Sequence, residues 1–260
     1  MVDGLRHEDS VPDPRARLPR RQRLLRQGVR RVHISVPLPE GLYGALRGLK
    51  RSLRPRAEGG RDLSGDREIE WSWVAARIPQ GSGEAIDFGC GQSPLGVVAA
   101  HAGFRVTAVD LGEVAWPYRH ERLKFLQGDI LELPLEEARF DLAINCSAIE
   151  HVGIAGRYGV TEGHADGDLA AMARLRSLLR PGGLMLLTIP VGSDAVFAPW
   201  HRVYGPERLP RLLQGFTVES REFWLKDLEN RWERSDEGPA LATPSRERLY
   251  GLGCFVLRRS

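Results

Sequence analysis

The 260-residue chain contains few cysteines, few lysines and no long apolar run. Its three cysteines, Cys90, Cys146 and Cys254, are far apart and odd in number, which excludes a disulfide framework and predicts reduced thiols. None has a cysteine or histidine nearby at zinc-like spacing, so no metal site is expected. Apolar stretches such as 184–187 are far shorter than the roughly 20 residues of a membrane span. No transmembrane helix is predicted.

The N-terminus also lacks the apolar core of roughly 7–15 residues that a secretory signal carries, which favours a cytoplasmic location. Hydrophobic residues make up 42% and charged residues 27% of the chain, which excludes a fibrous or wholly disordered protein. Residues 1–61 hold 15 Lys and Arg against 6 Asp and Glu, while the whole chain has a net charge of +3. The basic charge is therefore concentrated in the N-terminal part.

Residues 1–60 are predicted to form a basic, partly disordered extension. Residues 1–33 combine prolines with an arginine run and have neither helical nor strand periodicity. Residues 39–54 carry leucines at helical spacing and fit a short basic amphipathic helix, which packs on the domain or contacts a membrane surface peripherally. Nucleic acid is disfavoured as a partner, because only three of the 37 cations are lysines and the arginine content is consistent with GC-rich codon usage.

Residues 61–260 have the pattern of one α/β domain. Helices are predicted over 66–78 and 168–179, where apolar residues recur at helical spacing between start and stop signals. Short apolar runs between helix-sized segments predict strands at 85–88, 105–109, 124–126, 141–145 and 184–189. This alternation predicts right-handed βαβ units and a mostly parallel sheet.

Two further strand-like runs, 216–223 and 250–257, have no convincing crossover helix between them. They are expected to pair as an antiparallel edge. The predicted fold is therefore a Rossmann-like, mostly parallel seven-stranded sheet with an antiparallel C-terminal edge and helices on both faces.

A glycine-rich turn follows the first predicted strand. Gly89 and Gly91 allow a ligand to approach the backbone closely, although a lone Gly-x-Gly also fits an ordinary tight turn. Asp110 ends the second strand, 21 residues after Gly89, where an acid accepts hydrogen bonds from ribose hydroxyls. Asp129, after the third strand, fits an adenine amino group, and the apolar Ile130 fits the ring. Strand-end acids in this order favour a nucleoside-containing ligand.

The ordered motifs resemble those of the class I S-adenosylmethionine-dependent methyltransferases. The resemblance covers about residue 66 to the C-terminus and rests on residues 87–91, 110, 128–130, 140–142, 149–152 and 179–183. Single motifs of this kind are common, whereas the ordered set is specific. The resemblance implies S-adenosylmethionine as the cofactor and methyl transfer as the reaction.

The resemblance also implies a set of cofactor-binding residues: Asp87, Gly89, Cys90, Gly91, Asp110, Leu111, Asp129, Ile130, Asn145 and Cys146. By this resemblance, Asp87 faces the ammonium group of the cofactor and the two glycines border its methionine part. Asp110 faces the ribose, and Asn145 and Cys146 line the reactive side. Ser93 stands where the family has a third glycine, so the loop conformation is expected to differ.

Three alternatives stay open. A nicotinamide-dependent oxidoreductase shares the fold, but the chain lacks both a full Gly-x-Gly-x-x-Gly and a Tyr-x-x-x-Lys pair. A nucleic-acid methyltransferase is disfavoured because residues 145–148 are not the Asn/Asp-Pro-Pro-aromatic sequence that many amino-group-methylating enzymes use to hold a flipped base. A non-catalytic cofactor-binding protein also fits, since a fold does not guarantee chemistry.

The acceptor site is expected after the fourth and fifth strands, because ligands bind beyond the carboxyl ends of parallel strands. Residues 153–167 form either a mobile lid or a solvated loop. Histidine suits removal of a proton at neutral pH, and the candidate bases are His151, then His201 and His164, each equally able to be structural. Arg157 and Arg202 could bind an acidic acceptor.

The predicted function is methyl transfer to oxygen of a small-molecule or glycan-type acceptor. The sequence predicts no particular acceptor and no oligomeric state.

Overall fold

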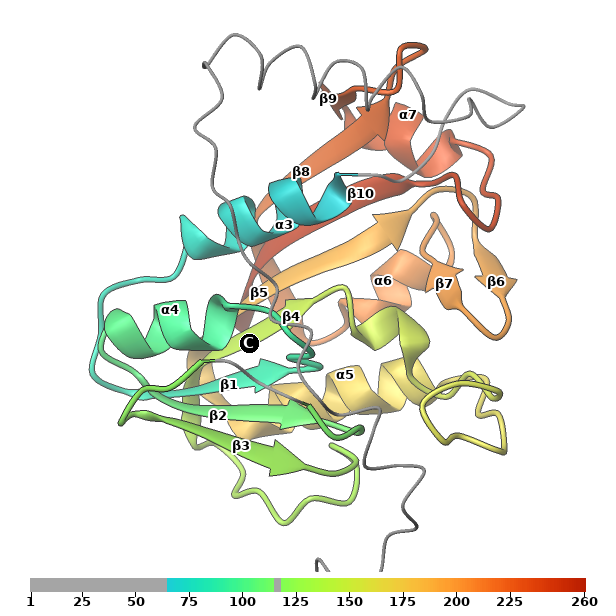
Figure 1. Cartoon of the computed structure of the whole chain (residues 1–260). Helices are drawn as coiled ribbons and strands as arrows, with labels where there is room; N and C mark the ends of the chain where they lie inside the picture. The colour runs from blue at the N-terminus through green and yellow to red at the C-terminus, as the bar shows by residue number, and fades with distance from the viewer. Residues whose placement is uncertain (1–64, 115–117) are drawn as a thin grey trace, which may run out of the picture. The chain divides into compact units, whose positions relative to one another are not determined.

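The computed structural model describes residues 65–114 and 118–260 (Figure 1). The predicted basic extension over 1–60, with its amphipathic helix, lies outside the described residues. In the described ranges, no helix is long and apolar enough to cross a membrane.

An eight-stranded sheet forms the centre of the domain, in the order β3-β2-β1-β4-β5-β10-β8-β9. Its strands are β1 Glu84–Phe88, β2 Arg105–Asp110, β3 Leu123–Gln127, β4 Phe140–Cys146, β5 Leu179–Val191, β8 Phe216–Lys226, β9 Trp232–Ser235 and β10 Gly251–Arg259. Strands β1 to β5 are parallel, β10 runs antiparallel to both β5 and β8, and β9 runs antiparallel to β8. The predicted Rossmann-like fold with its antiparallel C-terminal edge is confirmed.

The sheet has one strand more than predicted. Strand β9 consists of Trp-Glu-Arg-Ser and has no apolar run, so its pattern gave no strand signal. It forms by backbone pairing with β8 in a hairpin, where Phe223 lies opposite Ser235. A two-stranded sheet of β6 Ala195–Phe197 and β7 His201–Val203 was not predicted either.

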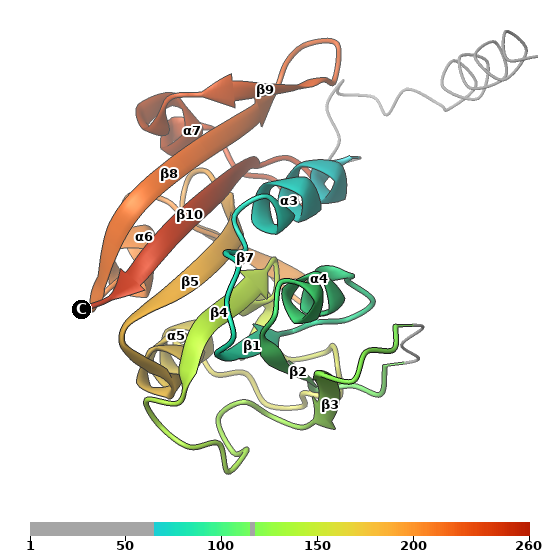
Figure 2. The same ribbon diagram turned by 90° about the vertical axis from the view of Figure 1, so that its left-hand side faces the viewer.

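Helices cover both faces of the sheet, as predicted (Figures 1 and 2). Helices α3 Asp66–Ala75 and α4 Leu95–His101 pack on one face, and α5 Gly167–Leu178, α6 Arg208–Leu212 and α7 Glu237–Ala242 pack on the other. Helices α3 and α5 correspond to the predicted 66–78 and 168–179. Helix α5 ends before Pro181 because Leu179 already pairs with Phe140 in the sheet.

The central strands are buried on both faces, which explains their nearly continuous apolar sequences. In β4, Ala143 belongs to the core under α5, and Ile144 belongs to the core under α3 and α4. In β5, Leu187 belongs to the core under α5, and Leu186 belongs to the core under α3 and α4. Because β1 to β5 are parallel, their carboxyl ends lie at one edge of the sheet, where the loops that follow them can form a binding site.

Candidate functional site

The turn after β1 requires glycine at its first position. Gly89 has a φ of +64°, and a Cβ there would lie 2.2 Å from the Cβ of Ala148. Gly91 has a φ of +45° with nothing within 4 Å of a built Cβ, so its left-handed backbone alone favours glycine. The N–H groups of Gly89 and Cys90 donate to the carbonyl of Val109 at 2.8 and 3.2 Å. These bonds join the turn to β2.

Asp110 connects two backbone turns at the end of β2. Its Oδ2 accepts from the N–H of Gly91 at 2.9 Å, and its Oδ1 accepts from the N–H of Gly112 at 3.0 Å. Each carboxylate oxygen can accept more than one hydrogen bond, so both remain able to accept from hydroxyl groups. Leu111 beside it is 40% exposed. The arrangement fits the predicted ribose contact.

Asp87 and Asn145 lie on neighbouring strands and are buried, 1% and 0% exposed. Among the described residues, Oδ2 of Asp87 and Nδ2 of Asn145 have no hydrogen-bond partner, whereas Oδ1 of Asn145 accepts from the N–H of Ile149 at 3.3 Å. Burial raises the pKa of Asp87 to about 7, and the charge of Asp110 adds to the increase. Buried polar atoms normally have hydrogen-bond partners, so a bound ligand is a natural partner for these two. A cationic ligand would favour the charged form of Asp87.

The remaining predicted cofactor residues lie at strand ends and are hydrogen-bonded or buried. Oδ1 of Asp129 accepts from the N–H of Leu131 at 2.9 Å, and Ile130 packs into the core beneath α5. Cys90 and Cys146 are buried free thiols. The roles assigned to these side chains by resemblance stay predictions. We call residues 87–91, 110–111, 129–130 and 145–146 together the cofactor edge.

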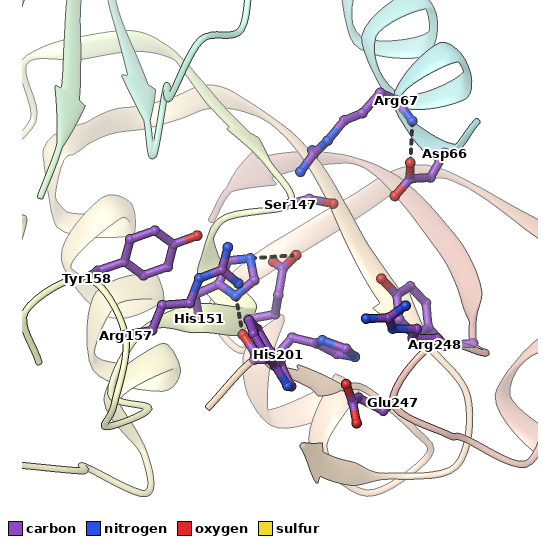
Figure 3. Close-up of a pocket in the computed structure, with 12 residues that line it drawn as sticks. Asp66, Arg67, Ser147, His151, Arg157, Tyr158, His201, Glu247 and Arg248 are labelled. Atoms are coloured by element: carbon purple, nitrogen blue, oxygen red, sulfur yellow. Dashed lines mark hydrogen bonds and ion pairs between the residues drawn. The ribbon is translucent and has the colours of Figure 1, made fainter. Parts of the chain in front are cut away.

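A polar cavity of about 290 Å³ lies beside the end of β4 (Figure 3). Five segments line it: the start of α3, the end of β4 with the short helix η3 Ile149–His151, the loop after η3, the β6–β7 hairpin and the segment before β10. They contribute Asp66, Arg67, Ser147, Glu150, His151, Arg157, Tyr158, Trp200, His201, Glu247, Arg248 and Tyr250.

His151 has a defined tautomer in this cavity. Its Nδ1 lies 2.5 Å from the carbonyl oxygen of Trp200, and because a carbonyl only accepts, Nδ1 carries the proton. The other nitrogen, Nε2, therefore holds the free lone pair and lies 3.8 Å from Oε1 of Glu150. Burial lowers the pKa of His151 to about 4, with the charge of Arg157 as a further cause. The imidazole is thus neutral at neutral pH.

Glu150 is a buried carboxyl that is not among the site residues predicted from the sequence. It is 2% exposed, and its Oε2 has no hydrogen-bond partner among the described residues. Burial raises its pKa to about 8, and the nearby charge of Glu70 adds to the increase. The carboxyl is therefore mostly protonated at neutral pH. Its position in the motif over 149–152 was the available signal, but neither its burial nor its neighbours follow from that motif.

A second buried glutamate, Glu70 of α3, ties the helix to the sheet. It accepts hydrogen bonds from the hydroxyl of Ser147 and from that of Thr188, the latter at 2.9 Å, and it pairs with Arg67 at 3.0 Å. Burial raises its pKa, and Arg67 opposes the increase. By sequence, Glu70 resembled an ordinary acid near a helix N-terminus, so its role was missed.

The structure brings together two of the three predicted histidines. His201 lines the cavity with its ring 4.9 Å from that of Tyr250, and burial lowers its pKa. His164 is exposed and is not among the residues that line the cavity. It therefore does not line the cavity of His151, and its role as a base stays a prediction.

Arg202 is placed differently from its predicted role as a ligand for an acidic acceptor. It is 2% exposed and donates to the carbonyls of Glu150, Val152, His164 and Ala165, and it lies 3.6 Å from Asp168. Its guanidinium therefore fastens the loop after η3 to β7. Arg157, the other predicted arginine, does line the cavity.

Known proteins resemble this chain in sequence and in fold. The family described as "Caenorhabditis protein of unknown function, DUF268" matches residues 134–231, less than half of the chain. A probable S-adenosylmethionine-dependent methyltransferase of Mycolicibacterium smegmatis is 27% identical over 148 residues, 52% of each chain. A malonyl-[acyl-carrier protein] O-methyltransferase of Pectobacterium atrosepticum is 28% identical over 153 residues, 56% of this chain and 55% of that protein. The match thus spans about half the length of these relatives.

The crystal structure of the [4+2]-cyclase SpnF superposes with a TM-score of 0.51, at 17% identity, over 84% of this chain and 94% of that one. At this identity the likeness shows the fold alone. The related sequences are named S-adenosylmethionine-dependent methyltransferase and O-methyltransferase, so the chain is similar in sequence to the class I S-adenosylmethionine-dependent methyltransferases that its ordered motifs resemble.

Proposed function

We propose that the chain is an S-adenosylmethionine-dependent methyltransferase that acts on oxygen of a small-molecule or glycan-type acceptor. The observation that carries the proposal is the cofactor edge. There, beside the Gly89–Gly91 turn, buried Asp87 and Asn145 each have a polar atom with no hydrogen-bond partner in the part of the chain that the structure describes. The names of the relatives support the cofactor, and the O-methyltransferase among them supports oxygen.

The residues present fit this cofactor. Asp87 offers a carboxyl for the ammonium group, the glycine turn offers close backbone approach, and Asp110 offers two acceptor oxygens for ribose hydroxyls. When bound, S-adenosylmethionine supplies an electrophilic methyl group on a sulfonium.

The chain itself has two tasks in such a reaction. The first is to align the acceptor atom, and the cavity beside Ser147 at the end of β4 provides the space for it. The second is to remove a proton where the acceptor is a hydroxyl. Nε2 of His151 is the free base in this cavity, and neutral Glu150 lies 3.8 Å from it. His201, at the start of β7, is the second candidate.

Isothermal titration calorimetry with the demethylated cofactor product, S-adenosylhomocysteine, tests the proposal. We expect binding to the product and none of comparable strength to NAD. Asp110→Ala should weaken product binding by about 1–3 kcal/mol, the cost of losing hydrogen bonds to a charged acceptor. Glu121→Ala is the matched control, because Glu121 is an exposed acid between β2 and β3 outside the cofactor edge. Preference for NAD, or an Asp110→Ala protein that binds like the control, would count against the proposal.

A further inference from the structure

Three arginines reach the polar cavity from three separate segments: Arg67 from α3, Arg157 from the loop after η3, and Arg248 from the segment before β10 (Figure 3). Arg67 is paired with Glu70 at 3.0 Å. Among the described residues, no carboxylate lies within the 4.0 Å of an ion pair from Arg157 or Arg248. Arginines that line a cavity and form no ion pair with a carboxylate are suited to bind an anionic ligand.

Arg157 is held in place by aromatic rings. Its Cζ lies 4.5 Å from the ring centroid of Tyr158 and 5.3 Å from that of Trp200. Cation–π contacts of this kind engage the face of the guanidinium and leave its N–H edge available for hydrogen bonds. Because the group is already ordered, a ligand would lose less side-chain entropy on binding it. Tyr158 and Trp200 are 49% and 43% exposed, so a ligand can reach this part of the cavity.

The other titratable groups of the cavity determine which ligand charge it can bind. Burial keeps Glu150 mostly protonated and both His151 and His201 neutral at neutral pH. The carboxylates that remain on the lining are Asp66 and Glu247. Among the described residues, neither Asp66 nor Glu247 forms an ion pair with Arg157 or Arg248, so both guanidinium groups can bind an anion. A dianion would meet stronger repulsion from Asp66 and Glu247 than a monoanion.

We propose that the methyl acceptor carries a carboxylate, which Arg157 binds through its N–H edge with Arg248 as a weaker second contact. This inference rests on the proposed function, because it names the class of acceptor for the same site. The aromatic side chains of Tyr158, Trp200 and Tyr250 give the cavity apolar surface for a ring, and about 290 Å³ suits a small molecule.

Three small probes test the inference on the full chain: benzoate, its neutral isostere benzamide, and the dianion phenyl phosphate. Binding is measured by calorimetry or ligand-observed NMR at low salt, with and without saturating S-adenosylhomocysteine. We expect benzoate to bind about tenfold more tightly than benzamide, the scale of a charge-assisted hydrogen bond at a partly exposed site. This preference should decrease as salt is added.

Variants assign the effect to residues. Arg157→Gln should remove the preference for benzoate, Arg157→Lys should keep part of it because the charge remains without the planar fork, and Arg248→Gln should weaken benzoate about threefold. Arg119→Gln, which changes an exposed arginine outside the cavity lining, should have no effect. Thermal melts of each variant verify folding, and Arg248→Gln tests the site from a second segment if Arg157→Gln does not fold.

Equal affinity for benzoate and benzamide would overturn the inference. So would an Arg157→Gln protein that loses both probes equally, because Arg157 would then only support the aromatic rings. Tighter binding of phenyl phosphate than of benzoate would overturn the assignment of a carboxylate. Failure of the proposed function is separate: S-adenosylhomocysteine would not bind, while the Arg157-dependent preference for benzoate would persist.

Discussion

The cofactor edge and the polar cavity meet at the end of β4 but are built in different ways. The cofactor edge comes from consecutive strand ends between residues 87 and 146. Several of its hydrogen bonds have backbone N–H donors, as between Gly89 and the carbonyl of Val109 or between Gly91 and the carboxylate of Asp110. The cavity is lined by side chains from residue 66 to residue 250. The first is therefore specified by short motifs, whereas the second depends on how distant segments pack.

The two regions also differ in the charged groups expected beside their buried acids. Asp87 and Glu150 both have a raised pKa because burial penalises the charged form. Asp87 lies where a cationic group of the cofactor is expected, so binding would restore its charge. Glu150 lies beside the neutral imidazole of His151, and the charge of Arg67 opposes the increase in its pKa only in part. Substitutions of cavity residues should therefore leave cofactor binding unchanged, whereas substitutions at the cofactor edge should weaken it.

The largest effect is expected from His151→Ala, which should lower methyl transfer by roughly 10²–10⁴-fold while product binding is unchanged, if the acceptor is a hydroxyl. The rate is measured under single-turnover conditions with an acceptor found by a labelled-methyl screen. Because the pKa of His151 is about 4, the imidazole stays neutral above about pH 5, and the rate should not rise with pH near 6.5.

His201→Ala is the matched control for that experiment, since His201 lies on the same cavity but on the β6–β7 hairpin. If both variants keep near-normal rates, neither histidine is the base, and alignment alone is the better account. If His151→Ala instead loses both stability and cofactor affinity, His151 is a structural residue that supports the cofactor edge as well as the cavity.

An intermediate effect is expected for the pH dependence of cofactor binding. The ammonium group favours ionised Asp87, whose pKa in the free protein is about 7, so binding should release a proton. Affinity for S-adenosylhomocysteine should therefore increase about tenfold from pH 6 to pH 8. Asp87→Asn should bind more weakly and lose this dependence, and Glu150→Gln should keep it. Calorimetry in buffers of different ionisation enthalpy measures the proton release directly.

The smallest effect is expected from Glu150→Gln on stability. The folded-state pKa of Glu150 is raised to about 8, so its favourable contribution is fully present below the unfolded pKa near 4.5 and is lost as pH rises through 8. The variant should thus gain about 1 kcal/mol or more over the parent at pH 8.5, roughly 2–4 °C in melting temperature, and less at pH 5. Glu247→Gln, an exposed acid of the same cavity, should show no such trend. A gain that is independent of pH would refute the assignment.

Much of the fold followed from local pattern. Buried parallel strands are apolar on both faces, so β1, β2, β4 and β5 were visible as short apolar runs. Strand β9 was not visible, because an edge strand with one neighbour needs no buried face. The glycine turn and Asp110 were also predictable, since their geometry arises within a strand and the turn that follows it.

The sequence by itself determined the parallel sheet, the order of the strand-end motifs and the candidates His151, His201 and Arg157. Only the tertiary structure decided that Arg202 fastens a loop, that His164 lies apart from the cavity, and that Glu70 and Glu150 are buried. The reason is physical. Periodicity reports which face of an element is buried, but the environment of a polar side chain depends on groups hundreds of atoms away along the chain, which set its partners, its desolvation and its pKa.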